Sequence, residues 1–197
     1  MPRRFALLLT LTLPTLLLAQ DSSSRSKPRG KSAPAARQTA ETTYRNPDFA
    51  FTYKIPYAWI DRTKQMQDDS ADPAKSRLLL AVFERPPEVT GDTVNSAVVI
   101  TAESASSYPG LKIAADYIGP LSELTTSKGF KADGDPYEFP VGSTTTVRAD
   151  FIRATGSVSM HQSSLVILRK GFVISFTFIA GSDDEIDELV EKLSCKP

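Results

Sequence analysis

The sequence has little of the residues from which catalytic and metal-binding sites are built. Its 197 residues include one cysteine, Cys195, and one histidine, His161. One cysteine cannot form an internal disulfide bond, and one histidine with one distant cysteine is too small a ligand set for zinc. There is no G-x-S-x-G segment, and Gly142-Ser143-Thr144-Thr145 lacks the lysine of a phosphate-binding loop. The sequence therefore predicts a protein that is not an enzyme and that has no cofactor.

The sequence also has no excess of charge of one sign. Basic and acidic side chains number 23 each, so the basic excess of a nucleic-acid-binding protein is absent. The balance conceals an asymmetry along the chain. Residues 20–43 carry five basic and two acidic side chains, whereas residues 44–197 carry 16 basic and 21 acidic ones.

The one long apolar run lies at the N-terminus. Arg3 and Arg4 precede about fourteen mostly apolar residues, 5–18, and the small residue Ala19 follows them. This order is typical of a cleavable secretory signal peptide, and the run is shorter than the roughly 20 residues of a transmembrane helix. Residues 1–19 therefore predict export by the general secretory route, to a periplasmic or extracellular location.

Residues 20–43 contain no aromatic residue and no isoleucine, leucine, valine or methionine. A segment with nothing to bury cannot offset the entropy lost on folding, so we expect a disordered linker. Its basic residues would give a weak, salt-sensitive attraction to membrane lipid or cell-wall polymer, although a plain soluble spacer is the favoured interpretation.

From residue 44 onward the pattern becomes that of a folded domain. Residues 49–55 alternate between apolar and polar positions, as in a strand with one buried face, and Trp59 is expected to fold back over its end. Residues 78–83 and 97–102 are apolar almost throughout, which predicts strands covered on both faces.

The first expected helix covers residues 112–126. Its apolar residues share one face, and Gly119-Pro120 predicts a kink or two short helices. The face is predicted to comprise Ile113, Ala114, Tyr117, Ile118, Leu121 and Leu124.

Four strands are expected next, at residues 137–141, 145–154, 160–169 and 172–179, and short turns force the last three into antiparallel hairpins. Ser182 and Glu185 then form the pattern of a capping box, followed by an amphipathic helix that continues to Leu193. Cys195 is expected to be packed where this helix ends. The fold class is α+β: a mainly antiparallel sheet with helices on both faces, an α/β/α sandwich.

Several of these segments resemble PsbP-like domains, whose fold is shared by the Ran-binding Mog protein of eukaryotes. The resemblance includes Asn46 with Phe49, the strand 51–56 followed by Trp59, the segment 147–151 after the turn at Val141-Gly142, and Lys170-Gly171-Phe172. Where the family usually has glycine, this chain has Ala50 and Ala58.

The resemblance implies a PsbP-like domain over residues 44–197. It also implies a non-catalytic accessory module that docks on protein or membrane-associated partners. The leading hypothesis is accordingly an exported binding module of the cell envelope that acts on an unidentified envelope protein. No metal ligand can be carried over from the family.

Two other functions are kept open. The first is a carrier with a ligand pocket between the sheet and helix 112–126. The second is an enzyme that uses only carboxylates, with Asp150, Glu138 and Asp133 as candidates.

The remaining patterns favour structural roles. Asp68, Ser70 and Asp72 have the spacing of a calcium loop, but Pro73 and Leu79 stand where glycine and glutamate are required. The acids at 183–188 are explained by helix capping and solvent exposure. His161 is predicted to be a half-exposed strand residue without a role. Trp59 is predicted to cap the core rather than to form a ligand platform with Tyr57.

Overall fold

The computed structural model describes residues 42–67 and 75–196. The predicted signal peptide, nearly all of the predicted linker and the calcium-like segment 68–72 lie outside these residues. Strand β1 begins at Thr42, so the last two residues assigned to the linker belong to the folded domain. Thr42 and Thr43 pair with Ile55 and Lys54, and β-branched threonine suits a strand that has such a partner.

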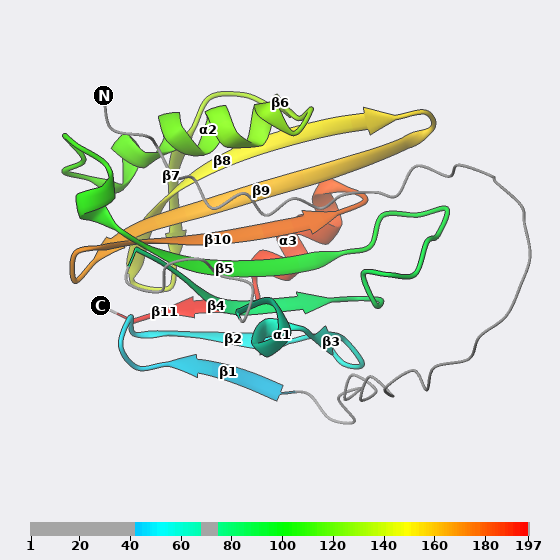
Figure 1. The fold of residues 1–197 in the computed structure, drawn as a ribbon, viewed down its shortest axis with the longest axis horizontal. Coiled ribbons are helices and arrows are strands. Elements are labelled where there is room, and N and C mark those ends of the chain that lie inside the picture. Colours follow the sequence, from blue (N-terminus) through cyan, green and yellow to red (C-terminus); the bar gives the residue numbers. More distant parts are fainter. Residues whose placement is uncertain (1–41, 68–74, 197) are drawn as a thin grey trace, which may run out of the picture. The chain divides into compact units, whose positions relative to one another are not determined.

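The larger of two sheets is antiparallel throughout and runs in the order β3-β4-β5-β10-β9-β8-β6, with β7 also paired to β8 (Figure 1). The hairpins expected from the short turns are present, because Gly156 and Gly171 take up the positive φ angles that tight turns require. The strands are β3 (Ile60–Asp61), β4 (Ser76–Phe83), β5 (Ala97–Ser104), β6 (Lys131–Ala132), β7 (Tyr137–Val141), β8 (Thr144–Thr155), β9 (Val158–Arg169) and β10 (Phe172–Ala180).

A second, smaller sheet was not predicted. It consists of β1 (Thr42–Asn46), β2 (Phe51–Ile55) and β11 (Leu193–Cys195), in the order β1-β2-β11. The expectation that the last helix continues to Leu193 is therefore wrong. Helix α3 (Asp183–Val190) ends earlier, because Leu193 and Cys195 bury their side chains on alternate positions of a strand paired with β2.

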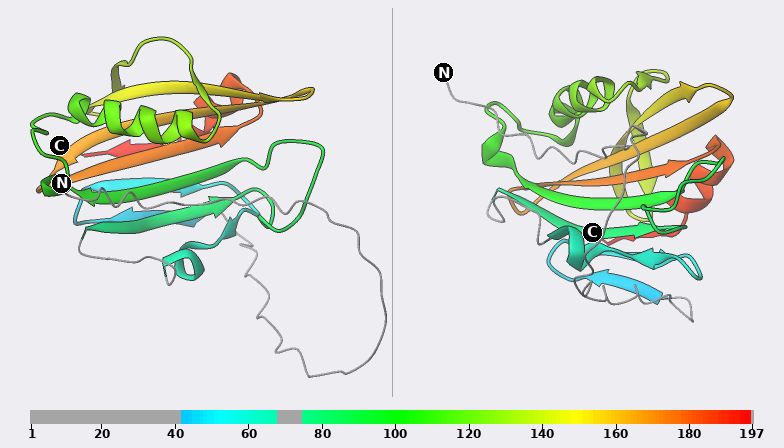
Figure 2. Two further views of the ribbon diagram at one scale, coloured as in Figure 1. Left: turned by 45° about the horizontal axis from the view of Figure 1, so that its top comes forward. Right: turned by 45° about the vertical axis from the view of Figure 1, so that its right-hand side comes forward.

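The two sheets enclose the main core. One face of the larger sheet packs against β2 and α3, and Figure 2 shows the small sheet on the side away from α2. The expectation that helices cover both faces of the larger sheet is not confirmed, because strands of the small sheet cover much of the face that also contacts α3. The largest fully buried side chains in this core are Phe51, Tyr53, Leu80, Ile100, Leu165, Ile174, Phe176, Phe178 and Ile186.

The opposite face of the larger sheet carries α2 (Ile118–Ser127), preceded by the short 3-10 helices η1 (Ala105–Ser107) and η2 (Ala114–Tyr117). The two short helices predicted around Gly119-Pro120 are η2 and α2, but they meet at Tyr117. Pro120 lies in the first turn of α2, where its missing N–H costs no helical hydrogen bond. Ile113 precedes η2 and is 60% exposed, so its assignment to the buried face is wrong.

Helix α1 (Thr63–Gln67) packs against β4, and Met66 completes a small apolar cluster there.

The predicted cap of α3 is confirmed in part. The Ser182 hydroxyl accepts a hydrogen bond from the Glu185 backbone N–H at 3.3 Å, but the Glu185 carboxylate binds the N–H of Gly181, one residue before the expected partner.

The two alanines that replace family glycines both lie in the left-handed region, with φ of 51° at Ala50 and 63° at Ala58. A Cβ atom makes this conformation costly by about 1–2 kcal/mol. Ala50→Gly and Ala58→Gly are each expected to raise the free energy of unfolding by about 1 kcal/mol, as measured by urea denaturation. Ala115→Gly, in an ordinary helical position of η2, should lower it instead; equal effects at all three positions would contradict the prediction.

Candidate functional site

Residues of β7, β8 and α3 meet in a cluster around Arg148, which we call the Arg148 cluster: Tyr137, Phe139, Arg148, Asp150 and Asp187. The Arg148 guanidinium donates to Asp150 at 2.9 Å through Nε and to Asp187 at 2.9 Å through Nη1. Its carbon Cζ lies 5.1 Å from the centre of the Phe139 ring and 6.0 Å from that of Tyr137. The Tyr137 hydroxyl donates to Asp150 at 3.2 Å. One arginine thus ties two strands to a helix.

The charges of the Arg148 cluster stabilise one another. Burial disfavours the charged form of Arg148, but its hydrogen bonds to Asp150 and Asp187 outweigh burial and raise its pKa. Burial and the nearby Asp150 carboxylate raise the pKa of Tyr137, so its hydroxyl remains a donor. The arrangement holds fixed charges and a fixed aromatic ring, and it leaves Asp150 an ion-paired acceptor.

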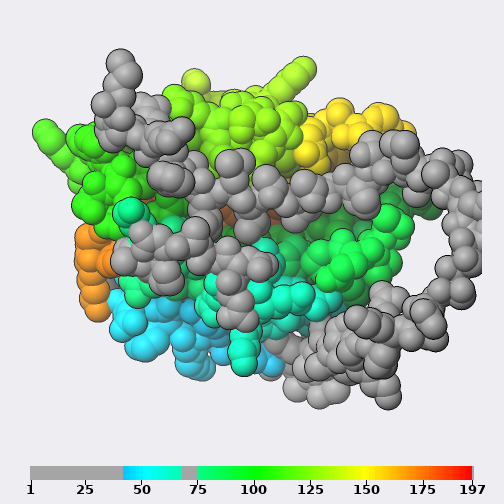
Figure 3. All heavy atoms as spheres, viewed as in Figure 1, coloured from blue at the N-terminus to red at the C-terminus, as the bar shows by residue number. Residues whose placement is uncertain are grey.

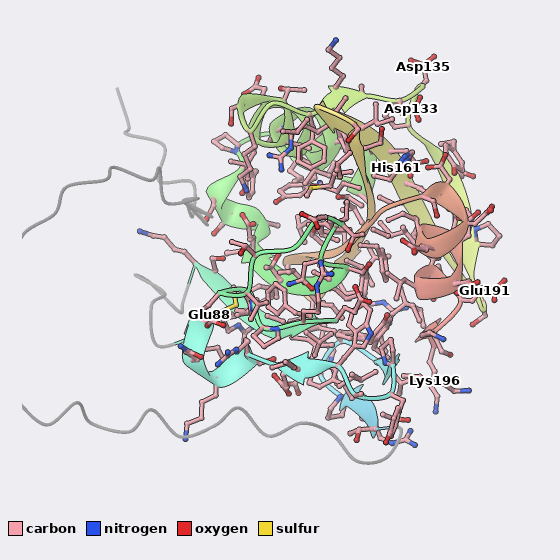
Figure 4. All side chains as sticks on the ribbon, turned by 90° about the vertical axis from the view of Figure 1, so that its right-hand side faces the viewer. Glu88, Asp133, Asp135, His161, Glu191 and Lys196 are labelled. Carbon is pink, nitrogen blue, oxygen red and sulfur yellow. The ribbon has the colours of Figure 1, made fainter. Side chains whose placement is uncertain are left out.

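The three carboxylates considered for catalysis do not form a common site. Asp150 is occupied by Arg148 and Tyr137. Glu138 is paired in register with Val147, whereas Tyr137 is paired with Arg148, so Glu138 belongs to the opposite face of the β7–β8 ribbon. The Asp133 backbone N–H donates to the Asp150 carbonyl at 2.8 Å, and its side chain is exposed on the β6–β7 loop (Figure 4).

His161 has a partner that the sequence did not reveal. Its Nδ1 lies 2.7 Å from an Asp183 carboxylate oxygen, which places the ring of a β9 residue beside the first turn of α3 (Figure 4). The acids at 183–188 are therefore more than caps and solvated groups. Asp183 contacts His161, and Asp187, although 60% exposed, binds Arg148.

Two variants compare the carboxylates of the Arg148 cluster. Asp150→Asn is expected to lower the free energy of unfolding by about 1–2 kcal/mol, because its side chain is only 23% exposed and both Arg148 and Tyr137 lose a charged acceptor. Asp187→Asn should cost about 0.5 kcal/mol or less, since water screens the exposed pair. Urea denaturation of both variants measures the difference, and equal costs would contradict it.

The other predicted ligand sites are occupied by the protein itself. Trp59 is buried in the main core while Tyr57 is 68% exposed, so the two rings form no shared platform, and the prediction that Trp59 caps the core is confirmed. Between α2 and the sheet, the space proposed for a ligand is filled by a packed apolar cluster: Tyr117, Ile118, Leu121, Phe130, Ala149, Phe151, Val166 and Val173.

The structure also reveals a half-buried carboxylate beside this cluster. Glu103, on β5, accepts hydrogen bonds from the hydroxyls of Tyr108 and Tyr117, the second at 3.0 Å. The two tyrosine rings meet edge to face, with their centres 5.1 Å apart. Burial, reinforced by the carboxylate, raises the pKa of both tyrosines. The three side chains fix η2 against β5.

Arg169 joins three segments at the other end of the strands. Its guanidinium donates to the backbone carbonyls of Phe49 at 2.7 Å and Ala50 at 3.2 Å. It also donates to the Thr144 hydroxyl at 2.9 Å and to the carbonyl of Lys196. We call this arrangement the Arg169 clamp.

Cys195 is packed beside the clamp, as expected, although in a strand. It is 3% exposed, and burial raises the pKa of its thiol to about 11. A buried, protonated thiol is a poor nucleophile.

Within residues 42–67 and 75–196, no three histidine, cysteine or acidic side chains gather as ligands for a metal ion. In the same ranges, no helix has the length and apolar character needed to cross a bilayer.

Together these features define an antiparallel two-sheet α+β domain with clusters of charged and aromatic residues. No family model matches the chain, and no curated protein matches it. A search of solved structures finds the cyanobacterial PsbP protein of Synechocystis sp. PCC 6803, with a TM-score of 0.52 and 12% identity, over 85% of this chain and 99% of that one. The chain has the PsbP-like fold.

Two further structures are similar at lower scores. The Ran-binding protein Mog1p of Saccharomyces cerevisiae has a TM-score of 0.46 and 12% identity, over 80% of this chain and 96% of that one. A Bacteroides thetaiotaomicron protein has a TM-score of 0.41 and 12% identity, over 81% of this chain. The chain spans half the length of that protein. At these identities the likeness concerns the fold alone.

Proposed function

We propose that this chain is an exported, non-catalytic accessory module of the cell envelope that acts by contact with a protein partner. The observation that carries the proposal is the position of Tyr137. Its side chain is 45% exposed, yet its hydroxyl is held by Asp150 and its ring lies beside Arg148 and Phe139. A rigid, exposed aromatic residue surrounded by charged groups is typical of the residues that dominate protein–protein binding energy.

The pairing of the carboxylates supports a binding role over a catalytic one. A general acid or base needs a carboxylate that is free to contact a substrate, and the Asp150 carboxylate already accepts hydrogen bonds from Arg148 and Tyr137. Glycosidic chemistry needs a second carboxylate facing the first across a substrate. Glu138 belongs to the other face of the ribbon. The fold shared with cyanobacterial PsbP is consistent with an accessory domain.

Export is supported by the sequence of residues 1–19, which has the charged, apolar and small-residue order of a signal peptide. We propose a periplasmic or extracellular location on this basis. The five basic side chains of residues 20–43 would add a weak attraction to anionic lipid or cell-wall polymer.

Site-specific photo-cross-linking tests the proposal. A photoreactive phenylalanine analogue would replace Tyr137 in the full chain, expressed in its own cells, and cross-linked species would be identified by mass spectrometry. We expect one dominant envelope protein. The matched control places the analogue at Tyr57, which is 68% exposed and lies outside the Arg148 cluster.

A partner captured from position 137 and absent at position 57 would support the proposal. Two outcomes would contradict it: an uncross-linked chain at native abundance, or the same set of proteins at both positions.

A further inference from the structure

A second charged and aromatic cluster lies where β9 turns into β10, at the end of the strands away from α3's first turn. It comprises Phe49, Arg77, Arg169 and Phe172, and we call it the Arg77 cluster. The Phe49 and Phe172 rings meet edge to face with their centres 5.6 Å apart. The Arg77 carbon Cζ lies 4.5 Å from the centre of the Phe172 ring and 5.7 Å from that of Phe49. Arg169 donates to the carbonyl of Phe49, so both arginines border the same pair of rings.

Neither arginine has a carboxylate partner within residues 42–67 and 75–196. The donors of Arg169 all go to neutral carbonyl and hydroxyl oxygens. Arg77 is half-buried, and its Nε is enclosed without a hydrogen-bond partner. Asp48, the acid in the adjoining turn, is exposed and makes no ion pair with another described residue.

The surface around the cluster adds more positive charge. Lys170 occupies the β9–β10 turn with φ of 49°, and Lys196 follows β11; both side chains are exposed. The β9–β10 turn forms part of the molecular surface, orange at the left of Figure 3. Two arginines and two lysines therefore meet at this end, whereas the α3 carboxylate Asp183 binds His161 near the opposite end of β9.

The geometry favours one kind of ligand. The Phe49 and Phe172 rings pack against the Arg77 guanidinium, and its Nη groups make no hydrogen bond to another described residue. Such a fork binds oxyanions with two parallel hydrogen bonds. Carboxylate and phosphate oxygens both suit it, and a carboxylate is the oxyanion that a protein surface supplies.

We propose that the Arg77 cluster is a carboxylate-binding site that receives an acidic segment of the protein partner. This inference rests on the proposed function, because it takes the ligand to be a protein. It names a surface distinct from the Arg148 cluster and gives the chemistry of the segment that contacts it.

The test is a titration of the full chain with an octaglutamate peptide, observed through arginine Nε–H resonances by NMR. Because the five basic side chains of residues 20–43 would also attract an acidic peptide, the readout must be specific for each arginine. Arg77→Lys assigns the Arg77 signal. Arg153 is the internal control: its Cζ lies 4.8 Å from the centre of the Phe130 ring, and it too has a buried Nε without a partner, but it lies elsewhere in the fold.

We expect the Arg77 signal to shift saturably while the Arg153 signal stays in place. By fluorescence anisotropy, Arg77→Gln should weaken peptide binding about tenfold and Arg153→Gln less than twofold. Three results would overturn the proposal: no shift at Arg77, equal shifts at both arginines, or saturation of Arg77 by inorganic phosphate or phosphatidylglycerol vesicles at lower concentrations than by the peptide.

Failure of the proposed carboxylate-binding site can be distinguished from failure of the proposed function. If cross-linking at position 137 captures a partner but the Arg77 signal does not shift with the peptide, only the proposal of a carboxylate-binding site is wrong. If Arg77 binds the peptide but cross-linking captures nothing, the site stands and the proposed function fails.

Discussion

Arg169→Met is expected to lower the free energy of unfolding by about 3 kcal/mol, which for a domain of this size lowers Tm by roughly 6–12 °C. The guanidinium joins the turn before β2, the β7–β8 turn and the C-terminal strand through four oxygen acceptors. Methionine fills similar volume but donates nothing, so these partly buried carbonyls lose their donor. Thermal and urea denaturation of the full chain measure the effect.

Two further variants separate the clamp from a general loss of charge. Arg45→Met removes an exposed arginine from β1 and should change the free energy of unfolding by no more than about 0.5 kcal/mol. Arg169→Lys keeps the charge but loses the planar fork, so we expect an intermediate cost. Equal stability of the Arg169→Met and Arg45→Met variants would mean that the clamp does not hold the segments together.

Raising the pH above about 10 is expected to unfold the domain steeply. Burial raises the pKa of Tyr53, Tyr108 and Tyr117, so the folded state keeps three protons that the unfolded state loses above its tyrosine pKa of about 10. The folded state then binds more protons than the unfolded one, and stability falls as pH rises. The slope should approach about 4 kcal/mol per pH unit, since each group contributes about 1.4.

The Cys195 thiol adds a smaller loss that begins earlier. Its pKa is raised to about 11 in the folded state, and an unfolded thiol ionises near 8.5–9. The free energy of unfolding should therefore begin to fall near pH 9, by up to about 1.4 kcal/mol per pH unit, before the tyrosines of the unfolded state ionise. Urea denaturation at half-unit intervals from pH 8 to pH 11 measures both phases.

Tyr53→Phe isolates one of the three tyrosines. Tyr53 is fully buried between the sheets, and its hydroxyl has no hydrogen-bond partner in the described structure. At pH 7 the variant should be as stable as the parent or slightly more so, because an unpaired buried hydroxyl is removed. Above pH 10 its slope should be shallower by about 1.4 kcal/mol per pH unit. Tyr57→Phe removes a hydroxyl from an exposed ring and is the matched control; identical curves for the two variants would refute the assignment.

The strands of the larger sheet could be predicted because their signals are local. Alternation and short glycine turns gave the hairpin from Thr144 to Arg169 to within two residues at its ends, and the strand at 137–141 without error. The capping pattern located the start of α3. Each of these signals depends on residues only a few positions apart, so no knowledge of the tertiary structure was needed.

The small sheet lacked such a signal. Strand β1 is largely polar, and β11 has three residues, too few to show a period, so Leu193 was assigned to the helix that precedes it. These strands form because β2 supplies partners on both sides. Tertiary pairing of this kind overrides local preference.

The charged clusters could be predicted only in part. The resemblance drew attention to the segment containing Arg148 and Asp150, but nothing in the sequence joined Arg148 to Asp187, or His161 to Asp183. These pairs form when α3 packs on the sheet. The sequence showed alanine at positions 50 and 58, where PsbP-like domains usually have glycine. The positive φ angles of both residues explain why glycine is usual there.

The order of strands in the small sheet has a consequence for biogenesis. Strand β2 sits between β1, from the beginning of the domain, and β11, from its end, so this sheet cannot close until almost the whole domain has been synthesised. Contacts between such distant segments form slowly, because a long loop must close first. A domain that needs its last strand to complete this sheet is expected to fold slowly, and a C-terminal truncation would leave β2 with an unpaired, aggregation-prone edge.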